Sequence, residues 1–144
     1  VDVEGRMEVT TAHTGLAGWH AYMAHGSDPA LLADLLAEDA VFHSPVVHTP
    51  QVGKRITTHY LMAAVQVFFN PSFRYVREVV GERDAVLEFE TTIDGIVVNG
   101  VDMVSWNDDG LVTSFKVMVR PLKAINLLHQ KMGEMLATLS GQYR

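Results

Sequence analysis

The sequence predicts a segregated α+β fold, in which helices come first and a strongly twisted antiparallel sheet of about five strands follows. Residues 85–119 read as three alternating strands joined by two tight turns, Asp94-Gly95 and 107–110. Helical apolar spacing precedes these strands, and a long amphipathic segment follows Pro121. The 144 residues are enough for one domain with a sizeable core, so we expect a single domain over 1–144.

The elements before the three strands are read from apolar periodicity and from turn residues. Residues 1–13 are mixed and polar, and we expect a loose lead-in there. Asp28 is a good N-cap, and Pro29 suits the first position of a helix. The expected elements are a helix from Thr14 with Leu16, Trp19 and Met23 on one face, a helix over 30–39, a short strand over 40–44 halted by Pro45, a helix over 54–69 with Ile56, Tyr60, Ala64 and Val67 inward, and a strand over 73–80.

The last helix, over 121–139, carries one apolar stripe. Its members are Leu122, Ile125, Leu128, Met132, Met135 and Leu139. Such a stripe must cover an apolar surface, which is either the open end of the sheet or a second subunit.

Strand periodicity gives the sheet an inner face, because side chains two residues apart share a side. The apolar sets are Leu87, Phe89 and Thr91 in one strand, and Phe115, Val117 and Val119 in another. Asp102 has the parity of its apolar neighbours Val98, Gly100, Val104 and Trp106. We therefore expect Asp102 to point inward with a raised pKa, able to donate a hydrogen bond.

Composition excludes several classes of function. The formal charge is −6 and the Lys and Arg residues are scattered, which argues against nucleic-acid binding. No run is long enough for a transmembrane helix, and the first residues lack the pattern of a signal peptide. With no cysteine in the chain, we expect a cytoplasmic protein without thiol chemistry.

The segments LLAEDAVFHSP and GVDMVSWNDDGLVTSFKVMV, in this element order, resemble the nuclear-transport-factor-two-like superfamily of cone-shaped α+β barrels. This group includes SnoaL-like cyclases, ketosteroid isomerases and epoxide hydrolases, and the resemblance covers about Gly15 to Val119. It implies a curved antiparallel sheet wrapped by the N-terminal helices, a cofactor-free activity and a homodimer. The fold hosts unrelated functions, so the resemblance specifies the architecture better than the reaction.

The isomerase within this superfamily uses an Asp base and an oxyanion hole made of Tyr and a protonated Asp. The resemblance places the oxyanion-hole Asp on Asp102, the Tyr on His20 and the base on Ser44. Serine is a poor base, so the isomerase reaction itself is not expected. We predict Asp102 and His20 as a catalytic acid–base pair, with Ser44 in the binding site. Alternatively, His20 packs in the core beside Trp19 and Ser44 bonds locally before Pro45.

The expected function is binding of a small apolar or aromatic molecule inside the cone, with acid–base catalysis as an added activity. The predicted wall consists of Trp19, Phe42, Tyr60, Leu87, Phe89, Phe115, Val117 and Val119. Phe68, Phe69, Phe73 and Tyr75 are further candidates for this wall, although core filling is the simpler reading for most of the aromatic residues. The alternatives are a non-catalytic ligand-binding module and a protein-interaction module.

Two other kinds of site are disfavoured. His43, His48 and His59 do not have the fixed spacing of a metal site, so no metal is expected. A triad of Ser44, His20 and Asp102 would need a nucleophile elbow, and the sequence has none. A homodimer through the outer face of the sheet is expected, because Val97, Val101 and Met103 alternate away from Asp102.

Overall fold

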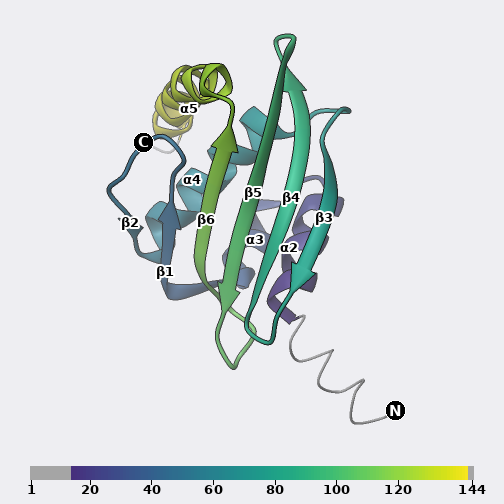
Figure 1. Cartoon of the computed structure of the whole chain (residues 1–144). Coiled ribbons are helices and arrows are strands. Elements are labelled where there is room, and N and C mark those ends of the chain that lie inside the picture. The colour runs from purple at the N-terminus through teal and green to yellow at the C-terminus, as the bar shows by residue number, and fades with distance from the viewer. Residues whose placement is uncertain (1–13, 143–144) are drawn as a thin grey trace.

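The computed structural model describes residues 14–142, which form N-terminal helices, a curved six-stranded sheet and a C-terminal helix (Figure 1). The predicted α+β class is confirmed. The predicted lead-in over residues 1–13 lies outside the described residues. The elements are α2 (Thr14–Ala24), α3 (Pro29–Leu35), β1 (Leu36–His43), β2 (Gln51–Val52), α4 (Lys54–Phe68), β3 (Arg74–Val80), β4 (Asp84–Ile93), β5 (Ile96–Trp106), β6 (Val112–Arg120) and α5 (Leu122–Gln142).

The strand order of the sheet is β2-β1-β6-β5-β4-β3, so β3 forms one edge and β2 the other. Strand β1 pairs with β6 in parallel, whereas the other pairs are antiparallel. The sheet is therefore mixed, which differs from the expectation of a wholly antiparallel sheet. Helices α2, α3 and α4 lie against one face of it, which we call the inner face (Figure 1).

The hairpin between β4 and β5 has the predicted two-residue turn. Asp94 and Gly95 have φ values of 51° and 79°, and Ile93 pairs with Ile96 across the turn. Left-handed backbone at both central residues is what a type I′ turn requires. This turn sets the register of β5 and with it the inward direction of Asp102.

The second helix is shorter than expected. Asp28 caps it as predicted, since its Oδ1 accepts a hydrogen bond from the Ala30 N–H at 3.0 Å. The helix ends at Leu35, and the backbone is extended at Leu36, where β1 begins. Pairing of Leu36 with Val112 in β6 outweighs the helix propensity of this segment.

Helix α4 is rotated relative to the expected face. Residues Leu61, Ala64, Val65 and Phe68 are buried, whereas Tyr60 and Val67 are only partly buried. The buried Thr57 hydroxyl donates to the carbonyl of Ala40 at 3.0 Å, and this bond ties the helix to β1 in the observed rotation. The rotation directs the second half of α4 toward the concave side of the sheet.

Helix α5 packs against α4 and the neighbouring ends of β5 and β6. Leu128, Met132 and Leu139 of the predicted stripe are buried together with Ala124, whereas Leu122 is 71% exposed. The stripe thus covers described elements of the same chain.

Candidate functional site

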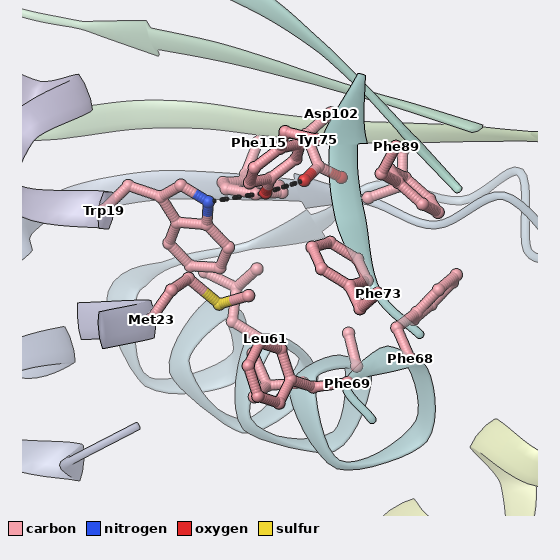
Figure 2. A pocket seen from close by; sticks show the side chains of 13 residues that line it. Trp19, Met23, Leu61, Phe68, Phe69, Phe73, Tyr75, Phe89, Asp102 and Phe115 are labelled. Atoms are coloured by element: carbon pink, nitrogen blue, oxygen red, sulfur yellow. Dashed lines mark hydrogen bonds between the residues drawn. The ribbon is translucent and has the colours of Figure 1, made fainter. Parts of the chain in front are cut away.

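A cavity lies between the inner face of the sheet and helices α2 and α4 (Figure 2). Its volume is about 30 Å³, which is space for roughly two water molecules. Its wall is apolar and rich in aromatic rings, apart from one carboxyl group, one phenol and one indole N–H. The lining residues are Trp19, Met23, Leu61, Ala64, Val65, Phe68, Phe69, Phe73, Tyr75, Phe89, Asp102, Phe115 and Val117.

Asp102 is the acidic residue of this wall. It points inward from the middle of β5, as predicted, and is 6% exposed. Its partners across the sheet are Leu87 in β4 and Val117 in β6, both apolar. No cationic side chain of the described residues pairs with it, so its environment disfavours the charged form.

A chain of two hydrogen bonds connects Asp102 to helix α2 (Figure 2). The Tyr75 hydroxyl donates to Asp102 Oδ2 at 2.6 Å, and the Trp19 indole Nε1–H donates to the Tyr75 oxygen at 2.9 Å. The three side chains come from α2, β3 and β5, so the chain holds together elements that are distant in the sequence.

Burial raises the pKa of Asp102 to about 7, and the hydrogen bond from Tyr75 opposes this by stabilising the carboxylate. Burial also raises the pKa of Tyr75 well above its usual range, and the negative charge of Asp102 raises it further. Tyr75 therefore stays protonated at neutral pH, whereas Asp102 exchanges its proton near neutrality. An acid with that pKa is suited to both donating and accepting a proton.

Tyr75 is the site residue whose role the sequence did not reveal. The register of β3 against β4 shifts between Tyr75 and Arg77, which is a bulge at Val76. Because of this bulge, Tyr75 lies opposite Phe89 and Glu78 lies opposite Leu87 in β4. Phe89 and Leu87 both face inward, so Tyr75 and Glu78 are on the inner side of the sheet as well. Strict alternation would place Tyr75 and Glu78 on opposite faces, so the sequence pattern carries no signal for the bulge.

The predicted pair of His20 and Asp102 is not formed. His20 Nε2 lies 2.7 Å from Glu78 Oε1, and the His20 side chain is 40% exposed. Its ring centroid is 5.9 Å from that of Tyr75. Helix α2 turns Trp19 toward the cavity instead, and Tyr75 takes the place beside Asp102.

Ser44 is not part of the cavity wall either. Its hydroxyl oxygen accepts hydrogen bonds from the N–H groups of Val46 at 3.1 Å and Val47 at 3.3 Å. This is a local turn of the kind that serine stabilises, so the alternative reading of Ser44 is confirmed.

Half of the predicted wall lines the cavity. Trp19, Phe89, Phe115 and Val117 do so. Phe42, Tyr60, Leu87 and Val119 belong instead to the core or pack against it. The remaining wall comes from Met23, the rotated face of α4 and the segment that joins α4 to β3, where Phe69 and Phe73 lie.

Within residues 14–142, no three His, Cys, Asp or Glu side chains are grouped so that they could hold a metal ion. None of the helices there has the length and apolar character needed to cross a membrane.

Residues 16–115 match the model of the SnoaL-like domain family. The chain belongs to the SnoaL-like domain family. A structure named as a steroid delta-isomerase from Pseudomonas aeruginosa is 35% identical, covers 91% of this chain and 95% of its own, and has a TM-score of 0.83. An uncharacterised cystatin-like protein from Silicibacter pomeroyi is 33% identical over 86% of each chain, with a TM-score of 0.76.

A third structure shares the fold alone with this SnoaL-like chain. It is a hypothetical protein with a ketosteroid isomerase-like fold from Catenulispora acidiphila, solved in complex with trimethylamine. It is 14% identical over 77% of this chain and 88% of its own, with a TM-score of 0.56. A search of the curated proteins found no match to this SnoaL-like chain.

Proposed function

We propose that this SnoaL-like domain binds a small apolar or aromatic molecule carrying one hydrogen-bond acceptor, with Asp102 as its polar anchor. The observation behind the proposal is a buried carboxyl group, without a cationic partner in the described residues, on an otherwise apolar cavity wall. Its pKa of about 7 keeps much of it protonated at neutral pH. A protonated carboxyl group can donate to a carbonyl or epoxide oxygen of the ligand.

In the proposed cofactor-free reaction, Asp102 donates its proton to this oxygen while a water molecule removes the α-proton of the ketone or attacks the epoxide carbon as its C–O bond breaks, and the proton released by the water restores Asp102. The charge that develops on an enolate or alkoxide is stabilised by a donor already held in a water-poor site. The 35% identical relative that is named as a steroid delta-isomerase supports carbonyl chemistry. Asp102 is the proposed acid because much of it is protonated at neutral pH. His20, the predicted base partner, is paired with Glu78 outside the cavity and does not take part.

Ligand entry requires movement at the mouth of the cavity, because its volume is about 30 Å³. Phe69 is 49% exposed at this mouth, and Met23 is only partly buried. Methionine adapts readily to a new neighbour, and an exposed ring loses few contacts when it turns. We propose that these two side chains move aside when a ligand binds.

The test is a titration of the full chain with acetophenone, a neutral aromatic ketone, by NMR at pH 5 and pH 8. The expected affinity is higher at pH 5, where Asp102 is protonated. Asp102→Asn keeps a donor and is expected to bind equally at both pH values, whereas Asp102→Leu is expected to lose binding. Glu90→Gln, on the outer face, is the matched control. Equal binding by wild type and Asp102→Leu would refute the proposed anchor.

Turnover separates the enzyme from the binding module. Conversion of a ketone or epoxide by wild type, lost in Asp102→Leu, supports the enzyme. Binding of such a compound without conversion by either protein supports the non-catalytic module. A cavity that takes up neither ketones nor epoxides would favour the protein-interaction alternative.

A small ammonium ion is the second candidate ligand. Aromatic rings around a carboxylate are a typical site for such cations, and one relative of the same fold was solved with trimethylamine. The pH dependence then has the opposite sign, because only ionised Asp102 attracts a cation. Trimethylammonium binding that is tighter at pH 8 and lost in Asp102→Asn would favour this candidate.

We also propose a homodimer through the outer face of the sheet. Val79, Val97 and Met118 are 59%, 58% and 50% exposed there, and Met118 pairs with Val101. An apolar face of this kind is covered in most soluble proteins. Light scattering at micromolar concentration is expected to give the mass of a dimer, and Met118→Lys is expected to give a monomer. A monomeric wild-type protein would refute the proposal.

A further inference from the structure

We infer that Trp19 and Tyr75 are positioning residues that commit the Tyr75 proton to Asp102 Oδ2 and leave Asp102 Oδ1 as the polar contact for the ligand. The ligand part of this inference rests on the proposed function. The arrangement of the hydrogen bonds does not, because it is a property of the protein without a ligand.

The direction of the chain follows from the chemistry of its first member. An indole N–H can donate a hydrogen bond but cannot accept one. Trp19 Nε1–H therefore uses a lone pair of the Tyr75 oxygen, at 2.9 Å, and the Tyr75 proton is directed to Asp102 Oδ2, at 2.6 Å. Tyr75 lines the cavity, yet its proton is not available to a ligand.

The second carboxyl oxygen is in a different situation. No described residue donates a hydrogen bond to Asp102 Oδ1. Among the described residues, Trp106 Nε1 is the fully buried side-chain nitrogen or oxygen atom that has no hydrogen-bond partner. Asp102 Oδ1 also has no partner but is not fully buried, so it retains some accessible surface. Because Oδ2 already accepts the Tyr75 proton, the proton of the neutral acid is placed on Oδ1. Oδ1 then donates to a ligand acceptor, and after ionisation it accepts from a ligand donor.

The surroundings of Asp102 contain few other charges that could set its ionisation. Helix α2 contributes His20 and β3 contributes Glu78, and these two pair with each other at 2.7 Å. Strand β4 presents Leu87 and β6 presents Val117, while α4 lines the cavity with apolar side chains. Among the described side chains, Tyr75 thus donates directly to Asp102, and Trp19 acts on Asp102 through Tyr75.

The first experiment is an NMR titration of the Asp102 carboxyl carbon in the full chain without ligand, with Asp102→Asn used to assign the signal. The wild-type midpoint is expected at about 7. Tyr75→Phe removes a donor to the carboxylate, so the midpoint is expected to rise by about one pH unit. Trp19→Phe is expected to raise it less, because it only weakens the Tyr75 donor. Ser105→Ala, a neutral change at an outward position of the same strand, is the control and should leave the midpoint in place.

A double variant distinguishes positioning from a general effect on packing. Since Trp19 acts through the Tyr75 hydroxyl, Trp19→Phe should produce no further shift when Tyr75 is already Phe. An equal shift of the midpoint with and without the Tyr75 hydroxyl would overturn the role of Trp19. A midpoint that does not rise in Tyr75→Phe would overturn the role of Tyr75. If Trp19→Phe does not fold, the indole N–H of wild type serves instead, and its proton resonance must shift in Tyr75→Phe.

The second experiment uses acetophenone at pH 5, where Asp102 is protonated in wild type and in Tyr75→Phe. If Oδ1 is the contact, Tyr75→Phe should change the affinity by less than about threefold. A loss of tenfold or more would show that Tyr75 holds the ligand and would overturn the inference. If acetophenone binds to neither protein, the proposed ketone ligand is refuted, while the titration of Asp102 still decides the hydrogen-bond chain.

Discussion

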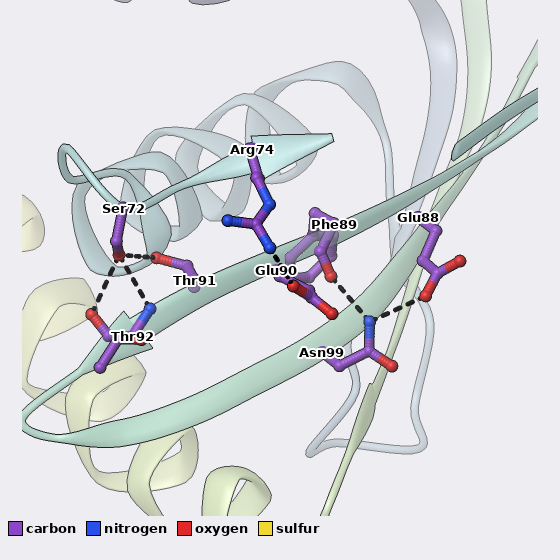
Figure 3. Close-up of polar contacts among 8 residues, drawn as sticks. All are labelled: Ser72, Arg74, Glu88, Phe89, Glu90, Thr91, Thr92 and Asn99. Atoms are coloured by element: carbon purple, nitrogen blue, oxygen red, sulfur yellow. Dashed lines mark hydrogen bonds and ion pairs between the residues drawn. The ribbon is translucent and has the colours of Figure 1, made fainter. Parts of the chain in front are cut away.

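The carboxylates on the two faces of strands β4 and β5 have different partners and different exposure to water. On the outer face Glu90 Oε1 lies 2.7 Å from Arg74 Nη2 (Figure 3). Glu88 Oε1 lies 3.5 Å from Arg77 Nε. Glu88 Oε2 also accepts from Asn99 Nδ2 at 3.1 Å (Figure 3). On the inner face Asp102 has a tyrosine hydroxyl as its partner and apolar side chains around it.

The difference shows that alternation along a strand places solvated carboxylates on one face of the sheet and a desolvated carboxyl group on the other. Each outer carboxylate lies beside water and an arginine, in an ion pair that water screens. The inner carboxyl group is desolvated, so its proton is held up to about pH 7. A group that exchanges its proton near neutrality is one that can act on a ligand.

The largest expected effect is on the pH dependence of stability. The folded pKa of Asp102 is about 7 and its ordinary value is 3.8, so between these values the folded state binds more protons than the unfolded state. The free energy of unfolding should therefore fall as pH rises through this window, by on the order of 4 kcal/mol from this group. Asp102→Asn should remove that contribution, which urea denaturation at pH 4 and pH 8 would measure. The same decrease in wild type and Asp102→Asn would contradict the raised pKa.

A smaller effect is expected from a methyl group added to the inner face. A Cβ at Gly100 would lie 2.6 Å from both the Met118 carbonyl oxygen and Phe89 Cζ. Gly100→Ala must displace the Phe89 ring or the backbone of β6, and should cost about 1–3 kcal/mol in the free energy of unfolding. Ser105→Ala, at an outward position of the same strand, is the control and should cost less than about 0.5 kcal/mol. Thermal unfolding of both variants checks the comparison, which fails if Gly100→Ala is as stable as Ser105→Ala.

The smallest effect is expected from the outer ion pair of Arg74 and Glu90. The two side chains are 68% and 39% exposed, so water screens the pair. Glu90→Gln should lower the free energy of unfolding by less than about 1 kcal/mol, and the difference should shrink at high salt. Urea denaturation at two salt concentrations measures this. A loss larger than that of Gly100→Ala would contradict the distinction between the two faces.

The inner face could be predicted from the sequence because buried and outward positions alternate without a break through β4, β5 and the part of β6 that begins at Phe115. The predicted inward direction of Asp102 and the burial of Leu87, Phe89 and Phe115 follow from that regularity. Strand β3 defeats the same reasoning, since the bulge at Val76 changes the parity between Tyr75 and Glu78. The family resemblance points to His20 as the partner of Asp102, whereas in the structure Tyr75 takes that place.

Helix α4 shows a second limit of sequence reasoning. Its apolar residues allow two neighbouring faces to be chosen as the buried one, and periodicity alone does not decide between them. The buried hydrogen bond from Thr57 to Ala40 joins residues distant in the sequence, and such a contact leaves no local pattern. The contribution of Leu61 and Val65 to the cavity wall could not be predicted for that reason.

Within residues 14–142, strand β3 has a hydrogen-bonded neighbour on one side only, yet it carries the phenol that stabilises the Asp102 carboxylate. Thermal fraying begins at such a sheet margin, and each excursion would take the Tyr75 hydroxyl away from Asp102. The pKa of the buried Asp102 is in this way coupled to local opening of the edge strand β3. Amide protons of residues 74–80 that exchange faster when Asp102 is protonated would be the visible sign of this coupling.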